Sequence, residues 1–136
     1  MNEVLIDTNI LVYAIDEDSE FYPKSQELLY NSDYGLFTTS KNLSEFLAVV
    51  TKGQVISLSI DEALAVSKDY DDILTIYPNE TSFTIFRELL QKYKPTGLRV
   101  HDFEIISIGL AHRINQIATF NTGDFKGVAE INLITI

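Results

Sequence analysis

The chain has 136 residues, of which 46% are hydrophobic, and it carries a formal net charge of −10. Apolar residues occur along its whole length, which disfavours a disordered chain, and no apolar run approaches the roughly 18 residues that a membrane-spanning helix needs. Cysteine is absent, which excludes a disulfide framework and a cysteine-bound zinc site. We expect a single domain over residues 1–136, cytoplasmic, without a signal peptide and without a membrane partner.

The acidic residues are concentrated in the first part of the chain. Residues 1–86 contain 15 acidic and 4 basic residues, whereas residues 87–136 contain 5 acidic and 6 basic residues. A chain this acidic is unsuited to coat nucleic acid, because phosphate binding relies on Lys and Arg. The distribution still allows a local nucleic-acid site in the second part, and solubility is the alternative explanation for the acidic part.

Hydrophobic periodicity and turn residues predict alternating strands and helices. Strands are expected at residues 4–6, 36–38, 73–77, 117–120 and 131–136. Helices are expected at residues 10–15, from Pro23 to about 30, through 43–50, from 59 to about 70, from about 82 to 93 and from 102 to 114. Val55–Leu58 is ambiguous between extended and helical structure, and residues 121–127 are expected to form a loop. This alternation predicts an α/β fold, a three-layer α/β/α sandwich with a central, mainly parallel sheet.

The segment VLIDTNILVYA, residues 4–14, places Asp7 directly after the first buried strand. Burying a charge is costly unless the charge is paired or hydrogen-bonded. Asp7 therefore either caps the helix that follows or forms one wall of a site that a positive group fills.

Three further acids are expected at the same edge of the sheet, because open parallel sheets bind ligands beyond the carboxyl ends of their strands. These acids are Glu45, Asp102 and Asp124. Each has a structural alternative: Asp102 could cap its helix, Glu45 could complete a capping box with Asn42, and Asp124 could be a turn residue. Converging carboxylates would repel one another, and a hard divalent cation such as Mg²⁺ or Mn²⁺ would relieve that repulsion.

Four segments together resemble the PIN domain, and more narrowly the VapC-type ribonuclease toxins of type II toxin–antitoxin (VapBC) systems. They are VLIDTNILVYA, LSEFL, VHDFEIISIGLAHR and IATFNTGDF, in the family's order and over essentially the whole chain. The resemblance implies that Asp7, Glu45, Asp102 and Asp124 are the catalytic and metal-binding residues. Many relatives place an acid where this chain has Asn121, so Asp124 is assigned to the fourth position and Asn121 is expected to be a neighbouring polar contact.

The resemblance implies a Mg²⁺- or Mn²⁺-dependent endoribonuclease that hydrolyses RNA phosphodiester bonds, is neutralised by a cognate antitoxin and forms a homodimer. Thr8, Asn9 and Thr119 would surround and position the acids. A PIN nuclease of RNA processing and a catalytically silent PIN-type binding module are the alternatives within the family. A response-regulator receiver is disfavoured, because the strand at 73–77 ends in Pro78-Asn79 rather than in an aspartate.

Basic residues flanking Asp102 and Asp124 are the hypothetical RNA contacts. They are Lys94, Arg99, Arg113 and Lys126. His101 precedes Asp102 and is expected to position it rather than to bind zinc. A zinc site is disfavoured because cysteine is absent and His112 lies on the far side of a helical turn.

Overall fold

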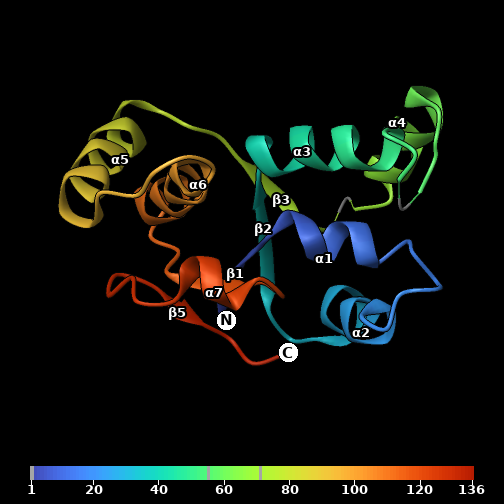
Figure 1. The fold of residues 1–136 in the computed structure, drawn as a ribbon. Helices are drawn as coiled ribbons and strands as arrows, with labels where there is room; N and C mark the ends of the chain where they lie inside the picture. The colour runs from blue at the N-terminus through green and yellow to red at the C-terminus, as the bar shows by residue number, and fades with distance from the viewer. Residues whose placement is uncertain (1, 55, 71) are drawn as a thin grey trace.

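The computed structural model describes residues 2–54, 56–70 and 72–136, so Val55 of the ambiguous segment lies outside the described residues. The described residues form a five-stranded sheet and seven helices (Figure 1). In chain order these are β1 (Glu3–Ile6), α1 (Thr8–Tyr13), α2 (Tyr22–Asn31), β2 (Gly35–Thr39), α3 (Ser40–Thr51), α4 (Ile60–Lys68), β3 (Leu74–Ile76), α5 (Glu80–Tyr93), α6 (Arg99–Ala111), β4 (Gln116–Ala118), α7 (Thr122–Phe125) and β5 (Asn132–Leu133). No helix in the described part of the chain is long and apolar enough to cross a bilayer.

The sheet is parallel throughout, with the strand order β3-β2-β1-β4-β5. The chain builds β2 and β3 on one side of β1 and then returns to build β4 and β5 on the other side. The strand order therefore reverses at β1, between β1 and β4. In open α/β sheets, such a reversal leaves a crevice at the carboxyl ends of the strands.

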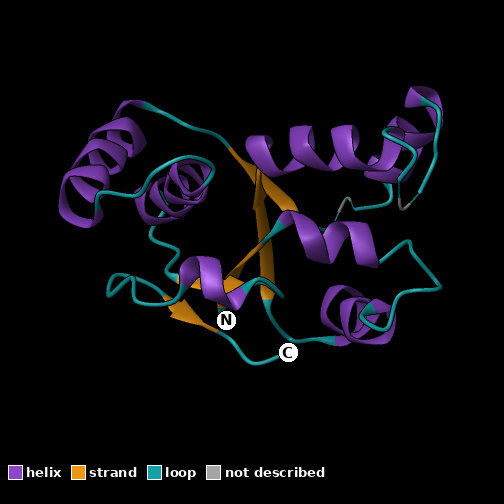
Figure 2. Ribbon diagram, viewed as in Figure 1, coloured by secondary structure: helices purple, strands orange, loops and turns teal. Residues whose placement is uncertain are grey.

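Alternate residues of β1 point to opposite faces of the sheet, which gives the fold its two cores. Val4 and Ile6 belong to a core that is covered by α1, α2, α3 and α4. Leu5 belongs to a second core, which is covered by α5, α6 and α7. The helices therefore lie in two layers with the sheet between them, as Figure 2 shows, and the expected three-layer fold is confirmed.

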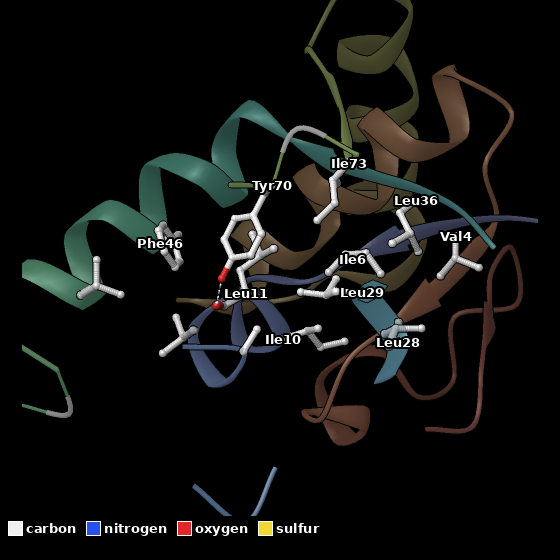
Figure 3. Packing of buried hydrophobic residues seen from close by; sticks show 14 of the residues in the cluster. Val4, Ile6, Ile10, Leu11, Leu28, Leu29, Leu36, Phe46, Tyr70 and Ile73 are labelled. Carbon is white, nitrogen blue, oxygen red and sulfur yellow. Dashed lines mark hydrogen bonds between the residues drawn. The ribbon is translucent and has the colours of Figure 1, made fainter. Parts of the chain in front are cut away.

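Figure 3 shows the first core, where Ile10, Leu11 and Phe46 pack among the strands and helices. The hydroxyl of Tyr70 enters this core and donates a hydrogen bond of 2.7 Å to the carbonyl oxygen of Leu11. This bond ties the segment after α4 to α1.

Several predicted boundaries are wrong. Helix α6 begins at Arg99, because Val100 and His101 already donate to the carbonyls of Gly97 and Leu98. The expected loop 121–127 contains the short helix α7, which Lys126 closes by donating to the carbonyl of Thr122. The last strand is only Asn132–Leu133, because it is an edge strand whose neighbour β4 is itself three residues long.

Candidate active site

Asp7 lies at the carboxyl end of the central strand, between two neighbouring strand ends. The pairing of Ile6 with Ala118 brings Thr119 beside Asp7, and the backbone N–H of Asp7 donates to the Ala118 carbonyl at 3.0 Å. Only 8% of Asp7 is exposed. Asp7 is also the N-cap of α1, so the capping interpretation and the site interpretation apply to the same residue.

The carboxylate of Asp7 accepts four hydrogen bonds. Its Oδ1 accepts from the backbone N–H of Thr8 at 2.9 Å and from the amide of Asn42 at 3.2 Å. Its Oδ2 accepts from the hydroxyl of Thr119 at 2.8 Å and from the amide of Asn9 at 3.4 Å. Burial raises the pKa of Asp7 above its ordinary value, although the bonds from Thr119, Thr8 and Asn42 act in the opposite direction.

A cavity of about 710 Å³ opens at this edge of the sheet, and all four predicted carboxylates line it. Asp7 follows β1, Glu45 lies in α3, Asp102 in the first turn of α6 and Asp124 in α7. The predicted polar residues Thr8, Asn9 and Asn121 line the same cavity. Thr119 is buried behind Asp7, and its hydroxyl accepts from the backbone N–H of Asn121 at 3.0 Å.

The carboxylates destabilise one another's charged forms. Burial, followed by the charges of Asp124, Asp7 and Glu45, raises the pKa of Asp102 to about 6. Arg99 acts in the opposite direction on the same pKa. Burial and the charge of Asp7 also raise the pKa of Glu45. A site in which several carboxylates lie close enough to repel one another is suited to binding a cation.

Helix capping accounts for only one of these four acids. The N-cap of α6 is Leu98, so Asp102 is not a cap, contrary to that alternative. The capping box of α3 joins Thr39 and Asn42, so Glu45 takes no part in it. Only Asp7 has a capping role that would explain its position without a ligand.

The donor chemistry fits Mg²⁺ or Mn²⁺. Carboxylate oxygens are the preferred ligands of these ions, and Mg²⁺ keeps several of its waters and uses one or two protein carboxylates. Within residues 2–54, 56–70 and 72–136, no three acidic or histidine side chains are gathered tightly enough to form a ready coordination shell. The carboxylates instead surround an open cavity, which suits a hydrated ion bound together with a phosphate better than a dehydrated ion in a protein cage.

Of the four predicted RNA contacts, only Arg99 lies in the lining of the cavity. Arg99 lines the cavity, and its guanidinium donates to the backbone carbonyl of Asp124 at 3.1 Å. Lys94 and Lys126 are exposed outside the cavity lining, at the ends of α5 and α7. Arg113 follows the C-terminal end of α6, whereas Asp102 lies in the first turn of this helix, and Arg113 is not among the residues that line the cavity. Its contact with RNA stays a prediction.

Lys41 lines the cavity and was missed by the sequence reasoning. It lies one turn before Glu45 in α3, and its ammonium group pairs with Glu104 at 3.3 Å. The spacing of four residues before Glu45 was the signal that could have identified it, since residues four apart share a helix face.

Histidine does not support a zinc site in the described residues. His101 lines the cavity at the start of α6, whereas a ring nitrogen of His112 lies 2.9 Å from the carbonyl oxygen of Ile108 at the other end of this helix. In the described part of the chain, no hydrogen bond joins His101 to Asp102. The expected positioning role of His101 therefore stays a prediction.

Five of the side chains that line the cavity are apolar or aromatic. They are Val12, Tyr13, Ala48, Val49 and Leu98. The ring of Tyr13 packs against Phe21 and Phe120, with centroid distances of 5.1 and 5.7 Å. A flat, supported aromatic ring beside a group of carboxylates can contact an unpaired base or an apolar side chain of a protein partner.

Comparison with known families matches residues 4–131 to the PIN domain. The fold is similar to VapBC2 from Rickettsia felis bound to a promoter DNA fragment, with a TM-score of 0.71, 21% identity and 97% of each chain covered. It is also similar to DNA-bound VapBC from Salmonella typhimurium (TM-score 0.69, 19% identity, 98% of each chain). A third similar structure is VapC20 of Mycobacterium tuberculosis, a sarcin–ricin loop cleaving toxin (TM-score 0.69, 10% identity, 90% of this chain and 92% of that chain). A search of curated proteins finds no match. At these identities the structural likeness shows the fold.

Proposed function

The chain belongs to the PIN-domain family, and we propose that it is a divalent-metal-dependent endoribonuclease, the toxin of a toxin–antitoxin pair. The observation that carries this proposal is the meeting of Asp7, Glu45, Asp102 and Asp124 in one cavity. The raised pKa values of Asp7, Glu45 and Asp102 support it, because the arrangement is costly unless a cation compensates it.

Each group of the cavity has a role in this proposal. The four carboxylates would together hold a hydrated Mg²⁺ or Mn²⁺, in part through the waters that the ion keeps, and the ion would supply an activated water and neutralise charge that develops on the phosphate. Asp7 is held in one orientation by Thr119, Asn9 and the backbone of Thr8, so this ligand is preorganised. Arg99 and Lys41 would bind phosphates of the RNA, which offsets the negative charge of the acids.

The aromatic ring of Tyr13 in the cavity lining supports a single-stranded RNA segment as the substrate. Tyr13 lies six residues after Asp7 on one short helix, which places it roughly 9 Å along the helix axis from the acidic end. A base released from pairing can stack on such a ring while its phosphate lies among the acids. The VapC20 structure concerns a toxin that cleaves the sarcin–ricin loop, and a loop of structured RNA is accordingly one class of target to test.

An antitoxin partner and a homodimer belong to the same proposal. Several structures with similar folds are toxin–antitoxin complexes. The acidic residues 1–86 would attract a basic partner. A native mass measurement at micromolar concentration tests the dimer, and finding only monomer would contradict it.

The first experiment is RNA cleavage by the purified protein with Mg²⁺ or Mn²⁺, with EDTA, and with Asp7→Asn. We expect cleavage that depends on the divalent ion and is lost in Asp7→Asn, because the amide removes one anionic ligand. Glu88→Gln is the matched control, since it removes an exposed acid of α5 outside the cavity lining.

The other outcomes separate the alternatives. Metal binding without cleavage of cellular RNA would favour the silent binding module. Cleavage without growth inhibition on expression in a bacterial host would favour a nuclease of RNA processing. Absence of both metal binding and cleavage would refute the proposal.

A further inference from the structure

Asn42 is a fully buried polar residue that lies behind the cavity rather than on its wall. Its exposed fraction is 0%, and it occupies the first turn of α3, one helical turn before Glu45. Buried amides are retained where their hydrogen-bonding groups have partners. The partners of this amide therefore indicate its role.

Both ends of the Asn42 side chain are engaged, and they face different elements. Its Oδ1 accepts from the hydroxyl of Thr39 at 2.7 Å and from the backbone N–H of Thr39 at 3.3 Å. Its Nδ2 donates to Oδ1 of Asp7 at 3.2 Å and to the hydroxyl of Thr8 at 2.9 Å. Exchanging the amide oxygen and nitrogen would leave a donor against the N–H of Thr39 and an acceptor against a carboxylate, so one orientation is strongly favoured.

The capping box of α3 uses only half of this side chain. A box requires an acceptor at the third helical position for the N–H of the capping residue. The same chain completes the box of α5 with a serine, since the hydroxyl of Ser82 accepts from the N–H of Asn79 at 2.8 Å. The NH₂ group of Asn42 is therefore not needed for the cap, and its bonds go to Asp7 and Thr8.

We propose that Asn42 is a positioning residue for Asp7, and that it couples the orientation of this carboxylate to helix α3, which carries Glu45. The inference rests on the proposed metal-dependent function. Asn42 holds Oδ1 from the protein interior, whereas Asn9, the donor at 3.4 Å to Oδ2, lines the cavity. A ligand that approaches Asp7 from the cavity reaches the side of the carboxylate to which Asn9 donates. The bond from Asn42 lies on the interior side, so it persists and keeps the carboxylate oriented toward the cavity.

The test compares Mn²⁺ affinity by calorimetry with thermal stability in EDTA. Asn42→Ser keeps a hydroxyl acceptor for the capping box, as Ser82 does in α5, and removes the NH₂ group. We expect the midpoint of unfolding to stay close to wild type while the Kd for Mn²⁺ weakens by about 10- to 100-fold, the usual effect of losing a residue that orients a ligand.

Ser82→Ala is the matched control, because it removes the equivalent residue of the α5 capping box outside the cavity lining. It should lower the unfolding midpoint and leave the Mn²⁺ affinity unchanged. If Asn42→Ser does not fold, Asn42→Thr fills more of the space, keeps a hydroxyl acceptor and is measured in the same way.

An unchanged Kd in a folded Asn42 variant would overturn the positioning role and reduce Asn42 to a helix cap. Absence of Mn²⁺ binding by the wild-type protein is a different result, since it would overturn the proposed function together with this role.

Discussion

Replacing Asp102 by asparagine should stabilise the metal-free protein at neutral pH, although it removes a residue of the proposed active site. Burial and three neighbouring carboxylates raise the pKa of Asp102 from its ordinary value of 3.8 to about 6. The folded state therefore binds more protons than the unfolded state between about pH 4 and pH 6. Wild-type stability should fall as the pH rises through this window, and the asparagine variant should lack this contribution.

The expected size follows from the pKa and from the exposure of the side chain. A pKa that rises from 3.8 to about 6 corresponds to about 3 kcal/mol for a fully shielded carboxyl. Asp102 is in partial contact with solvent, and screening reduces this figure to about 1.5 kcal/mol. Losing the charge near the N-terminus of α6 costs about 0.5 kcal/mol. The relief of repulsion is larger, and we expect a net gain of about 1 kcal/mol, or a midpoint roughly 4 °C higher.

The assay is thermal unfolding in EDTA from pH 4 to pH 8, for wild type, Asp102→Asn and the exposed control Glu88→Gln. The gain of Asp102→Asn should be small near pH 4 and reach its full size above about pH 6, while the control stays flat. A variant that is destabilised at pH 7.5, or equally stabilised at pH 4 and pH 7.5, would refute the electrostatic reasoning.

Three further predictions concern RNA binding and packing. Arg99→Ala should weaken RNA binding and reduce the slope of log affinity against log salt by about 0.7, because Arg99 lines the cavity. Arg113→Asn should change neither quantity, since Arg113 lies beyond the other end of α6. Equal effects of the two variants in a filter-binding titration would contradict this difference in position. Gly109→Ala should destabilise the protein by about 1 to 3 kcal/mol in urea unfolding, despite the higher helix propensity of alanine, because a Cβ would lie 3.1 Å from the Ile114 carbonyl oxygen and 3.1 Å from Leu5. Tyr70→Phe should cost about 1 to 2 kcal/mol in the same assay, since it removes the buried donor to Leu11; a neutral result would show that water replaces it.

The site itself was only partly predictable from the sequence. Asp7 could be identified because a carboxylate that interrupts an apolar strand is visible along the chain. Asn42 was visible only as a possible partner of Glu45 in a capping box, whereas the folded chain pairs it with Thr39 and aims its amide at Asp7. Lys41 was not identified, and Arg113 could not be placed relative to the cavity, because the distance of each residue from the carboxylates depends on where α3 and α6 lie against the sheet.

The sequence by itself determined the alternation of strands and helices, the fold class and the positions of Asp7 directly after a buried strand and of Asp102 near the start of a helix. These properties follow from local periodicity and from turn and capping residues, which act over a few positions. Only the tertiary structure decided that the hydroxyl of Thr119 donates to the carboxylate of Asp7, that the pKa of Asp102 rises to about 6 and that α6 begins at Arg99. Register between distant strands, burial and the proximity of like charges arise from residues up to 112 positions apart, which no local pattern encodes.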